Sequence, residues 1–241
     1  MKKYIFPLVC LLIVIVAACM YLCHDDDKAR NVLPKDVTAV AVLKPAELFQ
    51  DLGLSLEKVR KLPLDAEGIM ESVDLTKPIY AFATENGLSG VTLNVKDAAR
   101  LLQIASSFSF ASEEQQGFQW IVNNSTIGCI DEDKMLFVGP VASAEQDALR
   151  QIMVELMKQN RQDIPVLDKA EEQKGVLLAG TSLGNLPKQY TKTLPAGTDL
   201  SKAYLNLALR IDEEAIRLFA KVEGVDHLVV PMSPIKGNLI N

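Results

Sequence analysis

Cysteine is almost absent from the body of this 241-residue sequence, where Cys129 stands alone. The other three, Cys10, Cys19 and Cys23, all lie within the first 24 residues. A single cysteine cannot build a disulfide framework, and a chain of this length buries enough apolar surface to fold without one. Apolar residues flank Cys129, so we interpret it as a buried hydrophobe rather than a nucleophile.

Histidine is equally scarce, and the common catalytic motifs are missing. His24 precedes an acidic run, and His227 follows Asp226, whose side chain would face the opposite way in an extended chain. The Ser55-x-x-Lys58 spacing matches penicillin-binding enzymes, but the partner motifs of those enzymes are absent. The sequence contains no phosphate-binding loop, zinc-protease motif or dinucleotide fingerprint. We therefore predict no catalytic residue, metal site or cofactor; the alternative is an envelope hydrolase that uses carboxylate chemistry.

Clustered positive charge is the next feature that is missing. The chain has 25 lysines and arginines against 31 aspartates and glutamates, a formal net charge of −6. Affinity for a phosphate backbone needs grouped basic side chains, and here they are scattered among carboxylates. We expect no nucleic-acid partner.

The first 24 residues carry the one long apolar run. Lys2 and Lys3 precede residues 4–22, which are apolar apart from Pro7 within them, and His24 and three aspartates follow. Because positive residues stay on the cytoplasmic side, we expect the chain beyond this run to be translocated. We predict a signal peptide or membrane anchor over residues 1–24, an acidic tether over 25–32 and a soluble extracytoplasmic domain over 33–241. Residues 24–27 favour a solvated spacer over a metal site.

Two fates of this leader stay open. A secretory apolar segment is about 7 to 15 residues long and a membrane-spanning helix needs about 20, and this run falls between them. Ala17-Ala18-Cys19 resembles a lipoprotein signal, in which the cysteine thiol is acylated after cleavage. Met20, Tyr21 and Leu22 favour an uncleaved single-pass anchor instead, because a mature lipoprotein turns polar soon after its cysteine. Both fates place the domain outside the cytoplasm, on the membrane.

Strand patterns recur along the domain. Residues 37–43 are rich in β-formers, and strands over 78–83 and 91–95 flank Asn86-Gly87, a strong hairpin signal. Residues 118–122, 126–130 and 134–138 predict a three-stranded meander. Residues 175–179 predict a strand, and 203–211 and 216–222 predict a further pair, with a helix as the alternative for the last segment.

Helical patterns separate these strands. Pro45 opens a helix through Leu52, residues 97–106 form an amphipathic helix, residues 143–160 form the longest helix with Ser143 as N-cap, and 166–172 form a short one. Strands joined by tight turns and interrupted by helices predict an α+β fold with a mostly antiparallel sheet, with a doubly wound parallel fold as the alternative. The apolar residues after Leu228 indicate that the domain is truncated at its C-terminus or needs a partner.

Three aromatic residues are candidates for a recognition face. Trp120, Phe108 and Phe110 are the most concentrated aromatics of the domain. Tyrosine and tryptophan are common at interfaces, but aromatics are more often buried. The alternative for all three is therefore core packing.

Several segments resemble one protein family. They are Leu183-Gly184-Asn185-Leu186-Pro187, Leu194-Pro195-Ala196-Gly197, residues 199–204, 156–159 and 33–36, together with the leader. With these segments the chain is similar to the Bacteroidetes cell-envelope lipoproteins grouped as domain of unknown function 4836. The resemblance implies an uncharacterised, membrane-tethered envelope protein and carries over no catalytic residue. We expect a non-catalytic binding or structural module of the envelope, with a protein or glycan as partner.

Overall fold

The computed structural model describes residues 27–53, 66–160, 163–185, 199–212 and 215–225. The leader with Cys19 and His24, the Ser55-x-x-Lys58 match, His227 and the apolar residues after Leu228 lie outside the described residues. Of the helices within these ranges, none is long and apolar enough to cross a membrane.

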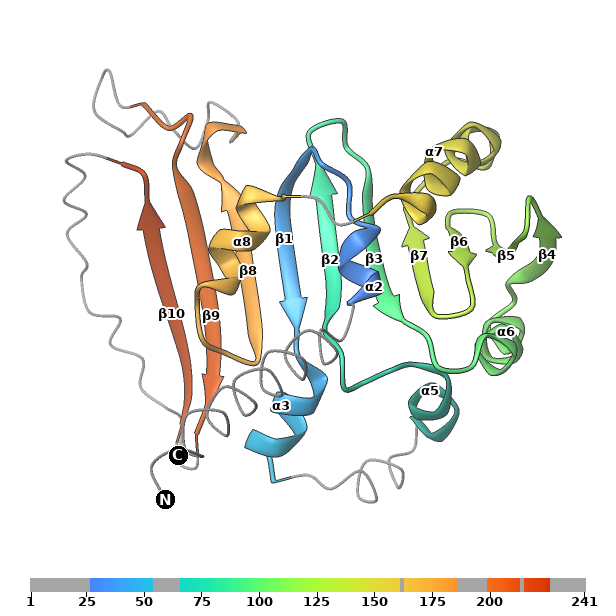
Figure 1. Cartoon of the computed structure of the whole chain (residues 1–241), viewed down its shortest axis with the longest axis horizontal. Helices are drawn as coiled ribbons and strands as arrows, with labels where there is room; N and C mark the ends of the chain where they lie inside the picture. The colour runs from blue at the N-terminus through green and yellow to red at the C-terminus, as the bar shows by residue number, and fades with distance from the viewer. Residues whose placement is uncertain (1–26, 54–65, 161–162, 186–198, 213–214, 226–241) are drawn as a thin grey trace, which may run out of the picture.

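The described strands form one ten-stranded sheet (Figure 1), in the order β10-β9-β8-β1-β2-β3-β7-β6-β5-β4. Every neighbouring pair is antiparallel. The α+β prediction is confirmed, and the doubly wound parallel alternative is wrong. The strands are β1 (Val37–Leu43), β2 (Ile79–Thr84), β3 (Ser89–Asn94), β4 (Ala111–Gln115), β5 (Phe118–Val122), β6 (Ile127–Ile130), β7 (Lys134–Val138), β8 (Leu177–Ser182), β9 (Tyr204–Ile211) and β10 (Ile216–Glu223).

Turn chemistry explains the hairpins that the sequence predicts. Gly87 has a φ of +82° in the β2–β3 turn, a conformation that glycine adopts without steric cost. The meander of β5, β6 and β7 and the β9–β10 pair also form as expected. The helix alternative for residues 216–222 is therefore wrong. Strand β4 was not predicted, because all five of its residues are exposed and no apolar alternation marks it.

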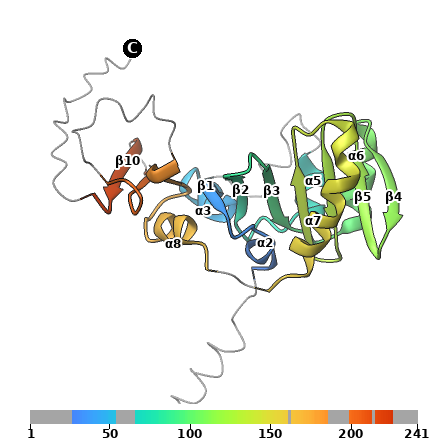
Figure 2. The ribbon, with the colours of Figure 1, turned by 90° about the horizontal axis from the view of Figure 1, so that it is seen from above.

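The helices lie on both faces of the sheet. Helices α2, α7 and α8 cover one face (Figures 1 and 2), and α6 packs on the opposite face of β5–β7. The helices are α2 (Lys28–Asn31), α3 (Pro45–Asp51), α5 (Ala66–Ser72), α6 (Ala98–Ser107), α7 (Gln146–Lys158) and α8 (Pro165–Glu171), with short 3-10 turns η2 (Ser143–Glu145) and η3 (Leu183–Asn185).

Strand alternation divides the buried residues into two cores. In β7, Leu136 and Val138 face the large core under α2, α7 and α8, whereas Met135 and Phe137 face the smaller core under α6. Successive side chains of a strand point to opposite faces, so one strand serves both cores. The sheet is thus a shared wall between two apolar layers.

Two predicted boundaries change. The acidic tether predicted over residues 25–32 ends earlier, because α2 begins at Lys28, and Ala29 within it and Val32 after it are completely buried. Ser143 does not cap α7, which begins at Gln146 after the 3-10 turn η2. The Ser143 hydroxyl instead donates a hydrogen bond to the carbonyl of Asn124, 2.9 Å away. Both corrections reflect contacts with distant parts of the chain.

Candidate functional site

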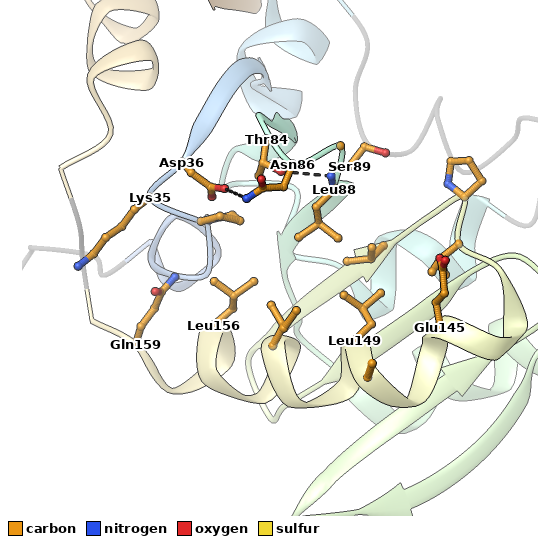
Figure 3. A pocket seen from close by; sticks show the side chains of 17 residues that line it. Lys35, Asp36, Thr84, Asn86, Leu88, Ser89, Glu145, Leu149, Leu156 and Gln159 are labelled. Carbon is orange, nitrogen blue, oxygen red and sulfur yellow. Dashed lines mark hydrogen bonds between the residues drawn. The ribbon is translucent and has the colours of Figure 1, made fainter. Parts of the chain in front are cut away.

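An open groove of about 560 Å³ runs between helix α7 and the β2–β3 turn (Figure 3). Four segments line it: the end of the α2–β1 connection, the β2–β3 turn, the end of β7 and the outer side of α7. The lining residues are Pro34, Lys35, Asp36, Thr84, Asn86, Gly87, Leu88, Ser89, Val138, Pro140, Val141, Glu145, Ala148, Leu149, Ile152, Leu156 and Gln159.

Helix α7 forms one wall of the groove. The apolar side of this helix includes residues that the sheet does not fully bury. Met153 and Met157, four residues apart, are completely or almost completely buried against the sheet. Ile152 and Leu156 form a second row with the same spacing, and they face the groove. The side chain of Ile152 is 49% exposed and Leu156 is half-buried. Leu156 also packs against the large core, so the apolar surface that α7 leaves exposed in the groove is mainly that of Ile152.

The β2–β3 turn forms the opposite wall, and hydrogen bonds fix it. The Leu88 amide donates to the Thr84 hydroxyl at 3.1 Å, and the Thr84 amide donates to the Leu88 carbonyl at 2.8 Å. The Asn86 side-chain amide donates to the Asp36 carboxylate at 3.2 Å and joins the turn to the start of β1. This wall is held in place before any ligand arrives.

The α7 wall of the groove is apolar along its middle, whereas polar side chains lie at the ends of the groove and along the β2–β3 turn. Figure 3 shows Lys35 and Gln159 at one end and Glu145 at the other, with Leu149 and Leu156 between them. The Gln159 side-chain amide donates to the Leu33 carbonyl at 2.9 Å, which ties the end of α7 to the α2–β1 connection. Apolar pockets with a few placed polar groups are typical of ligand sites.

The groove offers contact surface and hydrogen-bonding groups. Its two hydroxyls are engaged, since Thr84 accepts from Leu88 and Ser89 donates to the Gly139 carbonyl at 3.0 Å. Neither histidine nor cysteine is among its described lining residues. Across the described ranges, no group of three or more histidine, cysteine, aspartate or glutamate side chains could hold a metal ion.

Trp120 does not belong to a recognition face. Its side chain is fully buried in the large core, and the indole N–H donates to the Gln115 carbonyl at 3.0 Å. The Arg150 guanidinium lies 4.7 Å from the ring centroid. The recognition hypothesis is wrong for Trp120, because the alternation of β5 turns this side chain toward α7; core packing is what the structure shows.

The other two aromatics lie elsewhere. Phe110 packs against the smaller core, with its ring centroid 5.8 Å from that of Phe137 in an edge-to-face arrangement. Phe108, which ends α6, is 64% exposed. Trp120 and Phe110 therefore serve cores on opposite faces of the sheet, and the three aromatics form no common surface. A recognition role stays a prediction for Phe108 alone.

Cys129 is a buried core residue, as the sequence predicts. It is completely inaccessible among the large-core residues of β6. Burial, with a smaller contribution from Asp131, raises the pKa of its thiol to about 12. At neutral pH the thiol is protonated and shielded, so it is not a nucleophile.

A polar cluster fixes the start of the domain to the sheet and to α8. The Arg30 guanidinium donates to Asp168 at 2.6 Å and to Glu171 at 2.7 Å, and the Tyr80 hydroxyl donates to Asp27 at 2.5 Å. Burial lowers the pKa of Arg30, but the two carboxylates raise it by more. Burial is also the main cause of the raised pKa of Tyr80 and of Glu171.

Sequence reasoning missed both the groove and this cluster. The groove had one usable signal, because the apolar residues of 143–160 cover more of the helix than one packing stripe needs. The cluster had none, since its central pair, Arg30 and Glu171, is separated by 141 residues.

The comparisons with known proteins reach only the fold. No protein-family model and no curated protein matches the sequence. Among solved structures, the chain is similar to crystal form IV of TP0453, with a TM-score of 0.51 and 13% identity, over 80% of this chain and 78% of that chain. Crystal form III of TP0453 gives a TM-score of 0.48 and 12% identity, over 78% and 81%. At this identity the similarity shows a shared fold and no shared activity.

Proposed function

We propose that this chain is a non-catalytic binding module of the cell envelope, tethered by its N-terminus, whose groove beside α7 holds an apolar ligand. One observation carries the proposal: Ile152 and Leu156 present apolar surface opposite a turn that hydrogen bonds hold in place. A volume of about 560 Å³ lies within the roughly 300–1,000 Å³ of small-molecule sites.

The shape of the groove favours a single-chain amphiphile of the fatty-acid kind. Leu149, Ile152 and Leu156 follow one side of α7 and supply an apolar track. Lys35 at one end is an exposed cation, able to attract an anionic head group. An apolar body with a polar end matches this distribution of side chains.

The sequence supports the place of action. Lys2 and Lys3 before the apolar run favour a domain outside the cytoplasm. The resemblance to the envelope lipoproteins of domain of unknown function 4836 agrees with that place. A module of this kind would receive its ligand from the adjacent membrane.

Photolabelling tests the groove in the full chain. Membranes that contain the protein are given a photoactivatable fatty acid, and the labelled peptides are mapped by mass spectrometry. We expect label on residues 143–160 and on the β2–β3 turn. Ile152→Glu places a charge against the apolar body of the ligand, and we expect at least a tenfold loss of label, about 1.4 kcal/mol of binding free energy.

The matched control is Ile69→Glu. Ile69 is 41% exposed on α5 and does not line the groove, so this variant has the same change of charge at another apolar surface position. We expect it to label like the wild type. Equal loss in both variants, or wild-type label outside the groove peptides, would show that the groove is not the site.

A further inference from the structure

Strand β10 leaves one edge of the sheet open. It is the outermost strand (Figure 1), and none of the described strands pairs with its outer side. Its eight residues contain no proline, and its apolar side chains are exposed: 70% for Ile216, 67% for Leu218 and 49% for Val222. Natural proteins blunt such edges or pair them, because an open apolar edge is a template for another strand.

The β9–β10 turn determines which backbone groups of β10 face outward. The Asp212 amide donates to the Ala215 carbonyl and the Ala215 amide donates to the Asp212 carbonyl, so these two form a hydrogen-bonded pair. Such pairs alternate along an antiparallel ladder. The residues whose N–H and C=O groups point away from β9 are therefore Ile216, Leu218, Ala220 and Val222.

A second hydrogen bond supports this assignment. The Val176 amide donates to the Leu209 carbonyl at 2.9 Å, so the backbone of Leu209 bonds toward β8. Leu218, which lies opposite Leu209, is then left with its own backbone groups directed to the free edge.

These outward groups permit a self-complementary register. If two β10 strands pair antiparallel around Ala220, Leu218 lies opposite Val222 of the second copy and Ala220 lies opposite its own equivalent. On the other face, Arg217 lies opposite Glu223 of the second copy, twice by symmetry. These contacts would add to the ion pairs that each residue makes within its own chain, Arg217 with Asp212 and Glu223 with Lys169 and Lys221. A register centred on Phe219 would instead place Arg217 opposite Lys221. Opposite charges across a strand pair stabilise it and like charges destabilise it.

The face beside this edge is apolar well beyond β10. Residues that pair across neighbouring strands form an apolar row on this face, which consists of Leu218, Leu209, Leu177, Leu43 and Ile79. A second row, of smaller side chains, lies next to it. Leu177 in the first row is 38% exposed. Edge pairing would place two such faces side by side and bring Leu218 of each copy into contact with Val222 of the other.

We propose that β10 is the docking surface for a second copy of this chain, whose own β10 pairs with it antiparallel around Ala220 to join the two sheets across a two-fold axis. The interaction is self-complementary, as two-fold symmetry requires. Strand addition at an open edge supplies the hydrogen bonds, and the Arg217–Glu223 pairs select the register.

Cysteine crosslinking in the full chain tests the register. Cα atoms of a hydrogen-bonded antiparallel pair lie about 5.5 Å apart, within the roughly 4.4–6.8 Å of disulfides. Ala220→Cys is expected to give a disulfide-linked dimer on mild oxidation, identified by mass spectrometry of the linked peptide. Leu218→Cys is the matched control, because its equivalent in the second copy would lie about 13 Å along the strand. It is expected to give no such peptide.

Ala220→Pro tests the pairing itself. Proline removes an N–H that points outward, so the β9–β10 ladder keeps its hydrogen bonds. We expect light scattering of the detergent-solubilised full chain to give the mass of two copies for the wild type and of one copy for the variant. A single-copy wild type without an Ala220→Cys crosslink would overturn the proposal, as would equal crosslinking of Leu218→Cys. The proposal would also be overturned if a chain that ends at Val225 forms a dimer while the full chain does not. That result would mean that residues 226–241, and not a second copy, occupy the edge of β10.

Discussion

At the residue scale, Trp120 of β5 contacts both the neighbouring strand β4 and helix α7. Its ring is fully buried, its N–H reaches the Gln115 carbonyl, and Arg150 of α7 lies over its face. Arg150 also pairs with Glu113 of β4, so the same arginine joins the helix to the edge strand. An aromatic ring in this position contributes packing, a hydrogen bond and a cation–π contact together.

Trp120→Ala is therefore expected to lower the free energy of unfolding by about 3 to 5 kcal/mol, the usual cost of emptying a large aromatic site. Urea unfolding followed by far-ultraviolet circular dichroism measures it. Phe108→Ala is the comparison, because Phe108 is exposed and its loss is expected to cost no more than about 0.5 kcal/mol. A loss below about 1 kcal/mol for Trp120→Ala would contradict the packing role.

At the scale of elements, the Arg30 cluster joins α2 to α8 and to β2. These elements are far apart in the sequence. Arg30 joins α2 to α8, because its planar guanidinium donates to Asp168 and Glu171 of α8 at once, and the Tyr80 hydroxyl joins β2 to Asp27 before α2. The Asn94 side chain completes the arrangement by donating to Asp27 at 2.9 Å and accepting from the Ala29 amide at 3.3 Å. The start of the domain is thereby held against the sheet close to the point where the predicted tether ends.

This cluster makes stability depend on pH through Glu171. Burial raises the pKa of Glu171 above its ordinary 4.5, and Arg30 offsets only part of that rise. As the pH rises, the Glu171 carboxyl therefore loses its proton at a lower pH in the unfolded chain than in the folded protein. The contribution of Glu171 to stability falls as pH rises through the window between 4.5 and the raised value, and it is constant above that window.

Glu171→Gln removes this titration. We expect the unfolding free energy of the wild type, relative to the variant, to decrease with rising pH across that window. Chemical denaturation at a series of pH values measures the difference. Glu155→Gln, at an exposed position of α7, is the control and is expected to run parallel to the wild type. If the difference between wild type and Glu171→Gln does not change with pH, the raised pKa of Glu171 is contradicted.

At the scale of the whole molecule, the two fates of the leader predict different membrane anchors. If the Cys19 thiol is acylated, labelled palmitate will be incorporated, the mature chain will begin at Cys19, and Cys19→Ala will abolish both. An intact N-terminus at Met1 without label would identify residues 4–22 as a spanning anchor. Resistance to salt extraction does not separate the two, because several acyl chains and a spanning helix both anchor stably.

The fold was largely predictable because its signals are local. Asn86-Gly87 indicates a turn whatever lies around it, and the apolar spacing of residues 97–106 indicates a helix wherever it packs. The α+β class and most strands follow from such patterns. Strand β4 escaped because an exposed edge strand needs no apolar alternation, and α2 escaped because its four residues were assigned to an acidic tether.

The sequence alone determined most of the strands and helices and the buried, inert character of Cys129, because each depends on neighbours along the chain. Only the tertiary structure decided which face each side chain occupies. It buried Trp120, left Ile152 beside an open groove, and brought Arg30 to Glu171 across 141 residues. It also decided that β10 would be the last strand of the sheet, with its apolar face uncovered by any described element. The physical reason is that packing partners are chosen by the order of strands in space, which local sequence does not encode.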